Sequence, residues 1–107
     1  MPTVSEIHTM MVKGFVPEKA EGVNAVIQFD LSGDNAGQFY LVVENGTVSA
    51  GEGMAENPKM TLKATTEDYF NVATGKTNAM QAFMTGKIKI TGHMSLAMKM
   101  QSMFKTS

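Results

Sequence analysis

The sequence contains no cysteine and no arginine among its 107 residues. Without cysteine the chain has neither disulfides nor thiol chemistry, which fits a protein of the cell interior, and we expect it to be cytoplasmic. Arginine is the side chain best suited to bidentate recognition of phosphates and bases. Its absence, together with a formal net charge of -1, argues against a nucleic-acid partner.

Long apolar runs and targeting signals are also missing. The longest uninterrupted apolar stretches, such as residues 39–43, are far shorter than the ~20 residues that a membrane-spanning helix needs. Residues 1–15 hold no basic region followed by an apolar run, and the C-terminal residues do not match the Ser-Lys-Leu type of peroxisomal address. We expect no secretory signal and a single domain over residues 1–107.

Residues that could carry catalysis are sparse. A hydrolase without cysteine would need serine or threonine beside a histidine base, and the two histidines, His8 and His93, are isolated from any Gly-x-Ser-x-Gly turn. Two lone histidines and scattered carboxylates give no metal-ligand spacing. The segment 75–77 lacks the upstream glycine of a phosphate-binding loop. The sequence therefore predicts no enzyme, no catalytic residue, no metal and no cofactor.

Apolar periodicity and capping residues predict a mixed order of elements. We expect a helix over residues 3–14, a helix between Thr65 and Gly75, another between Asn78 and Gly86, and a last helix over residues 93–104. The pair Asn45-Gly46 is the strongest hairpin signal and predicts a type I′ turn. The predicted strands span residues 25–31, 38–44, 47–53, 60–64 and 88–90.

Methionine is the most unusual presence, with eleven residues, six of them between Met80 and Met103. Because methionine is unbranched and polarizable, it fills irregular gaps and tolerates guests of varied shape. Two interpretations stand: a methionine-rich core that only packs, or an adaptable apolar cavity that holds a flexible ligand. The last helix favours the cavity, since only Ser95, Lys99 and Ser102 form a polar stripe on it. That helix is also the candidate lid.

Several separated motifs resemble the sterol-carrier-protein type-2 family. They are residues 24–31 (NAVIQFDL), 57–62 (NPKMTL), Gly75-Lys76 followed by 82–92 (AFMTGKIKITG), and 94–101 (MSLAMKMQ). The resemblance covers residues 21–104 and implies an α+β fold, a five-stranded, largely antiparallel sheet with helices packed on one face around an apolar tunnel. It also implies non-enzymatic binding and transfer of sterols, fatty acids, fatty acyl-CoA or phospholipids.

The tunnel implied by the family would be lined by apolar side chains from the sheet and the helices. We expect ligand contacts from Ile27, Phe29, Phe39, Leu41, Met60, Leu62, Phe70, Met80, Phe83, Met84, Met94 and Met98. The expected partner is a lipid or fatty acyl ligand. Four lysines and no acid between residues 86 and 107 are either a solvated face or a weakly basic surface for transient contact with anionic membranes.

Two other functions stay open. In the first, the chain is an interaction or substrate-presenting module whose apolar last helix pairs with another subunit, in a homodimer, or with a lipid-metabolising enzyme. In the second, it is an enzyme acting on a lipid thioester, with His8 or His93 as the base.

Overall fold

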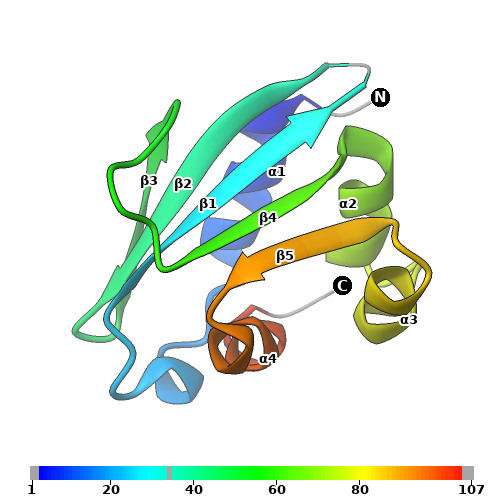
Figure 1. Ribbon diagram of the computed structural model, residues 1–107. Coiled ribbons are helices and arrows are strands. Elements are labelled where there is room, and N and C mark those ends of the chain that lie inside the picture. Colours follow the sequence, from blue (N-terminus) through cyan, green and yellow to red (C-terminus); the bar gives the residue numbers. More distant parts are fainter. Residues whose placement is uncertain (1–2, 34, 105–107) are drawn as a thin grey trace.

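The computed structural model describes residues 3–33 and 35–104, which form a five-stranded sheet and its covering helices (Figure 1). The strand order is β3-β2-β1-β4-β5, and β1 pairs with β4 in parallel while the other three pairings are antiparallel. The strands are β1 (Ala25–Ser32), β2 (Gly37–Glu44), β3 (Thr47–Glu52), β4 (Met60–Thr65) and β5 (Ile88–Gly92). The helices are α1 (Val4–Lys13), the 3₁₀ helix η1 (Pro17–Ala20), α2 (Thr66–Ala73), α3 (Ala79–Met84) and α4 (Met94–Met103).

The element boundaries follow local capping chemistry, as the sequence predicts. Thr3 forms a capping box with Glu6 at the start of α1. The side chains of Thr65 and Asn78 accept hydrogen bonds from backbone N–H groups in the first turns of α2 and α3. Asn45-Gly46 joins β2 to β3 with positive φ at both residues, as a type I′ turn requires.

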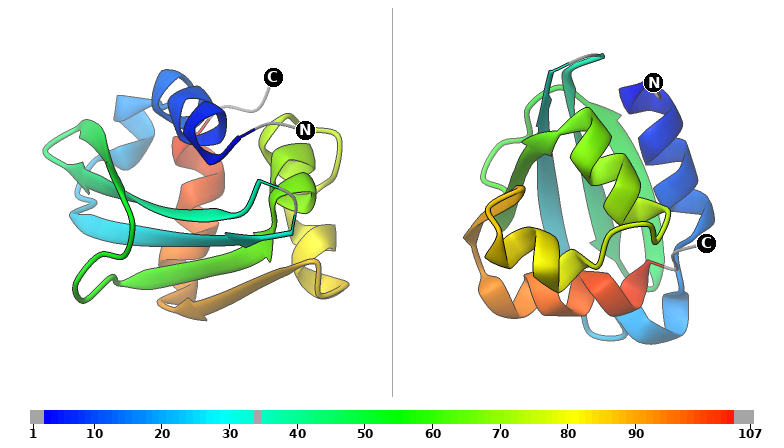
Figure 2. Two further views of the ribbon diagram at one scale, coloured as in Figure 1. Left: turned by 90° about the horizontal axis from the view of Figure 1, so that it is seen from above. Right: turned by 90° about the vertical axis from the view of Figure 1, so that its right-hand side faces the viewer.

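The helices cover one face of the sheet (Figure 2). Strand alternation and register place polar side chains such as Gln28, Gln38 and Lys63 on the other face. The covered face is the hydrophobic core, where Phe29 and Phe39 stack as a cross-strand pair with ring centroids 4.6 Å apart. Side chains along β4 alternate between the two faces, since Met60 and Leu62 are buried and Lys63 is exposed. The predicted α+β class and largely antiparallel sheet are confirmed.

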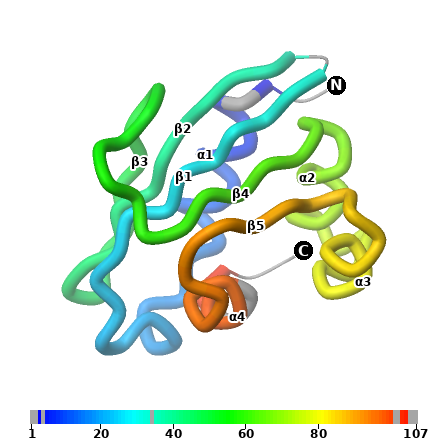
Figure 3. The backbone as a smooth tube through the Cα atoms, viewed as in Figure 1, coloured from blue at the N-terminus to red at the C-terminus, as the bar shows by residue number. Residues whose placement is uncertain are grey.

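The segment between β3 and β4 crosses the outer face of the sheet, because β4 pairs with β1 rather than with β3 (Figure 3). Gln28 holds this crossover in place from the outer face of β1. Its amide nitrogen donates to the carbonyls of Phe39 at 3.1 Å and Gly53 at 3.0 Å, and its amide oxygen accepts from the Ala55 N–H at 2.7 Å. A fully buried polar side chain thus replaces ladder bonds that the crossover cannot make.

The exit from β5 depends on a glycine. Gly92 has a φ of +102° and pairs with Met60 at the start of β4. A Cβ atom at Gly92 would collide with the carbonyl oxygen of Lys59, so a side chain would push β5 away from β4. The same carbonyl accepts the N–H of His93 at 3.1 Å, which sets where α4 begins.

We predict that Gln28→Leu lowers the free energy of unfolding by about 2–3 kcal/mol, because it leaves peptide groups of the crossover without partners. Urea denaturation followed by far-ultraviolet circular dichroism measures this change. The matched control is Gln38→Leu on the neighbouring strand, where the side chain is exposed and makes one 3.4 Å contact with Asp30. The control should change stability by less than about 0.5 kcal/mol. Equal effects of the two substitutions would contradict this role of Gln28.

Candidate ligand-binding site

The space between the sheet edge and helices α3 and α4 holds a cavity of about 250 Å³, which we call the apolar cavity. Every side chain of its described wall is apolar, so the cavity can remove hydrocarbon from water but offers no polar partner. The wall consists of Leu62, Val72, Ala79, Met80, Phe83, Ile88, Ile90, Met94, Ala97, Met98 and Met100.

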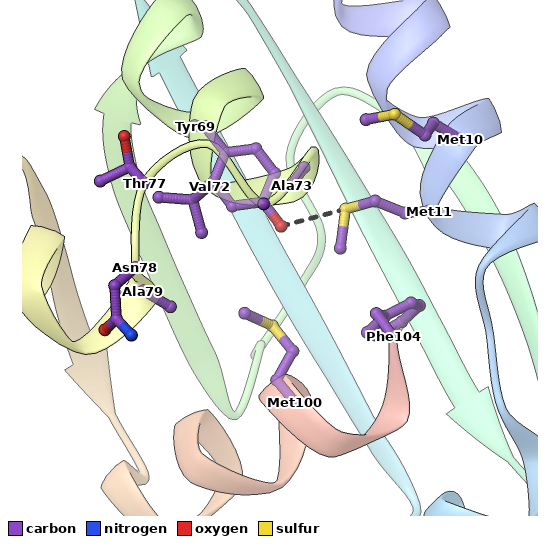
Figure 4. Close-up of a pocket in the computed structure, with 11 residues that line it drawn as sticks. Met10, Met11, Tyr69, Val72, Ala73, Thr77, Asn78, Ala79, Met100 and Phe104 are labelled. Carbon is purple, nitrogen blue, oxygen red and sulfur yellow. Dashed lines mark hydrogen bonds between the residues drawn. The ribbon is translucent and has the colours of Figure 1, made fainter. Parts of the chain in front are cut away.

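A second cavity of about 300 Å³ lies between α1, α2 and the C-terminal end of α4 (Figure 4). We call it the tyrosine cavity, because the Tyr69 side chain extends across it toward α1. Its described wall carries polar groups but no charged side chain. The wall consists of Met10, Met11, Tyr69, Val72, Ala73, Gly75, Thr77, Asn78, Ala79, Met100 and Phe104.

The two cavities share three wall residues, namely Val72, Ala79 and Met100. They therefore adjoin, and the boundary between them is made partly by one flexible methionine. Each cavity is at or just below the lower end of the ~300–1,000 Å³ range of small-molecule sites. Taken together, their volumes fall within that range.

Tyr69 brings a polar group into this apolar surrounding. It is 3% exposed, its ring packs edge-on against Phe29, and its hydroxyl donates to the Met11 sulfur at 3.1 Å. Burial raises the pKa of Tyr69 far above its ordinary value, because desolvation disfavours the phenolate. The hydroxyl therefore keeps its proton at physiological pH and remains a hydrogen-bond donor.

Four exposed methionines, Met80, Met84, Met94 and Met98, lie beside the apolar cavity, and we call them the methionine rim. Three of them also line the cavity, and Met84 lies one helical turn beyond Met80 on α3. Met84 is 78% exposed and Met98 is 65% exposed, which is unusual for large apolar side chains. The rim marks an apolar entrance between α3 and α4.

The C-terminal end of α4 is fastened to the segment that follows α1. Phe15 and Phe104 form an isolated antiparallel bridge with ring centroids 5.6 Å apart, and the Val16 N–H donates to the Met103 carbonyl at 2.7 Å. The N-terminal end of α4 carries the exposed Met94 and Met98. The role of α4 as a lid stays a prediction.

The twelve side chains predicted to contact a ligand fall into three groups. Leu62, Met80, Phe83, Met94 and Met98 come together in the wall of the apolar cavity. Phe70 is half-buried against the core, and Met84 is exposed on the rim. The remaining five are fully buried on the sheet and lie outside both described walls: Ile27, Phe29, Phe39, Leu41 and Met60. Their contact with a ligand stays a prediction.

The sequence reasoning missed the small residues that create the space. Ala79 lies in both walls and Ala97 in the apolar one, while Ala73 lies in the tyrosine cavity. The sequence predicts the helix that carries Tyr69 and Ala73, but it gives neither residue a role in the site. Met100 was visible in the run of methionines, but its position between two cavities depends on how α4 packs.

The described residues offer little for catalysis. His8 is half-buried on α1, with its ring 5.5 Å from that of Phe39, and His93 is exposed at the start of α4. No three histidine, aspartate or glutamate side chains among the described residues lie close enough to hold a metal ion. Within the same part of the chain, no helix has the length and hydropathy needed to cross a membrane.

Known proteins resemble this chain over nearly its whole length. Hydroxysteroid dehydrogenase-like protein 2 of Danio rerio is 35% identical over 96 residues, which cover 86% of this chain and 23% of that protein. The chain thus spans about a quarter of that curated relative. A double mutant of the sec-alkyl sulfatase PisA1, from Pseudomonas sp., superimposes with a TM-score of 0.85 at 17% identity, covering 99% of this chain and 17% of that one.

A solved structure of similar size has the same fold. The palmitated sterol carrier protein 2 like 2 of Aedes aegypti superimposes with a TM-score of 0.77 at 20% identity, covering 98% of this chain and 97% of that one. The model of the SCP-2 sterol transfer family matches residues 13–105. With these residues matched in a fold that carries adjoining cavities beneath its sheet, the chain belongs to the SCP-2 sterol transfer family.

Proposed function

We propose that this chain binds a flexible lipid in the joined cavities and transfers it without a chemical step. One observation carries the proposal: two cavities share the side chain of Met100, and one of them has an entirely apolar described wall. Membership of a sterol transfer family supports it, as does the shared fold with a palmitated protein.

The driving force is the removal of hydrocarbon from water. Each buried CH₂ group of a lipid chain contributes about 0.8 kcal/mol. Methionine and alanine side chains around the cavity accept chains of different shape at small energetic cost, because methionine changes rotamer easily. This wall favours a range of lipids over a single ligand, and a sterol or an acyl chain would satisfy it equally.

The methionine rim is the proposed route of entry. Of the two helices beside it, α3 has one fully buried residue, Ala82, and its packing partners are β5 and α2. Lys87, Lys89 and Lys99 are exposed on the elements that flank the rim, which favours approach to an anionic lipid surface. The rim would then meet the membrane while the lysines hold the molecule against the headgroups.

A second candidate function rests on the same rim. Exposed apolar side chains also suit contact with another protein, and this chain corresponds to a quarter of a dehydrogenase-like relative. The chain would then present its lipid to an enzyme or pair with a second copy. Sedimentation over a range of concentrations tests the second copy, since a homodimer joined through the rim should dissociate on dilution and in Met84→Glu.

We predict that Ala79→Phe weakens lipid binding without loss of stability, because the added ring occupies space that both cavities share. Excluding two CH₂ groups of a chain should weaken binding on the order of tenfold. Native mass spectrometry of the freshly purified protein, followed by lipid extraction, measures the bound lipid. The melting temperature should stay constant or rise, as expected when a cavity is filled.

The matched control for this experiment is Ala50→Phe, on an exposed position of β3 away from both described walls. It should keep the wild-type lipid content. If Ala79→Phe retained as much lipid as the control, the joined cavities would not be the binding site. If the wild-type protein carried no lipid and took up none, the proposed function would be wrong.

We predict that Met84→Glu slows lipid transfer to anionic vesicles on the order of tenfold, because it removes an apolar contact and adds a repelled charge. The equilibrium affinity for lipid should change by less than about twofold, since Met84 lies outside both described walls. Transfer of a fluorescent lipid between vesicles measures the rate. Met54→Glu, at another exposed methionine on the β3–β4 crossover, is the control, and equal slowing by both would contradict entry at the rim.

A further inference from the structure

The Tyr69 hydroxyl has a poor hydrogen-bond partner for so buried a group. It donates to the Met11 sulfur, and a thioether is a weak acceptor. Buried tyrosine hydroxyls ordinarily find an oxygen or nitrogen partner. Since methionine is flexible, Met11 can turn aside when a stronger acceptor arrives.

The position of this hydroxyl fits a ligand that spans both cavities. Tyr69 faces the tyrosine cavity (Figure 4). The apolar cavity adjoins it through the shared residues Val72 and Met100. The other polar side chains of the described wall, Thr77 and Asn78, lie on the side away from Met11 (Figure 4). Asn78 is exposed and Thr77 is half-buried, so water can reach their donor groups, whereas the Tyr69 hydroxyl is buried. The two adjoining cavities therefore have one apolar end and one end with a buried donor.

We infer that the Tyr69 hydroxyl donates a hydrogen bond to the polar end of the ligand, replacing its bond to Met11, while the apolar chain passes Met100 into the apolar cavity. The inference rests on the proposed function and adds an orientation to it. The ligand class that it specifies is an elongated lipid that ends in an uncharged carbonyl or hydroxyl oxygen.

The absence of charged side chains in the described walls disfavours a free carboxylate at this end. A carboxylate buried beside Tyr69 would have one hydrogen bond and no cation within the described wall, and an unpaired buried charge costs several kcal/mol. A ketone, ester or alcohol oxygen loses far less hydration free energy than a carboxylate when it leaves water. One hydrogen bond inside the cavity compensates for that loss. The cavity thus selects for neutral polar ends.

The test uses 2-tridecanone labelled with ¹³C at its carbonyl carbon. Its carbonyl resonance reports hydrogen bonding, and the intensity of the bound signal reports occupancy. In the wild-type protein the bound resonance should lie downfield of its position in cyclohexane. In Tyr69→Phe it should return toward the cyclohexane position, and the affinity should fall about 3- to 10-fold.

The other tyrosine of the chain, Tyr40, is a matched control. It packs over Gly51 on β3, away from both described walls. Tyr40→Phe should keep the wild-type resonance and affinity. An unchanged downfield resonance in Tyr69→Phe would overturn the inference and leave lipid binding intact. No bound ketone in any variant would overturn the proposed function as well.

Two further measurements keep the inference testable if Tyr69→Phe fails to fold. Met11→Leu conserves volume and removes the competing acceptor, so ketone binding should hold or tighten about 2- to 3-fold. Weaker binding to Met11→Leu would contradict displacement of the sulfur. At pH 8 the wild type should bind dodecanoate at least ~10-fold more weakly than the ketone, and equal affinity would overturn the neutral end.

Discussion

The parallel pairing of β1 with β4 is the constraint on which the rest of the molecule depends. This pairing joins the three strands β1, β2 and β3 to the C-terminal half of the chain, which supplies every helix of the apolar cavity. Because the chain must cross the outer face to make this pairing, the buried amide of Gln28 is needed to satisfy the crossover. β5 then pairs with β4, and α2, α3 and α4 lie on the inner face (Figure 2).

The helices cover that face without filling the space beneath it. Large side chains such as Phe29 and Leu41 pack the core against the sheet, whereas alanines stand where α2, α3 and α4 meet. A small residue at a junction of helices leaves volume that a rigid core would fill at native density. Methionines surround this volume, and their flexibility lets the same wall close over different lipids.

Local signals made the elements predictable from the sequence. Asn45-Gly46, Thr3 and Asn78 act within a few residues of themselves, so the hairpin and the helix starts were confirmed where they were expected. The site was less predictable, because a cavity is where side chains are small or absent. Ala79 and Met100 acquire their position only when distant helices pack together. The cytoplasmic location and the identity of the lipid stay predictions.

The central claim is that one lipid chain occupies both cavities and passes Met100. The most direct measurement is nuclear magnetic resonance of the protein labelled with ¹³C at its methionine methyl groups and loaded with an alkyl-chain ligand. The account predicts nuclear Overhauser contacts from the chain to Met98 in the apolar cavity, to Met100, and to Met11 in the tyrosine cavity. Contacts should be missing at Met54, which is exposed on the crossover. Contacts confined to one cavity, with none at Met100, would contradict the account.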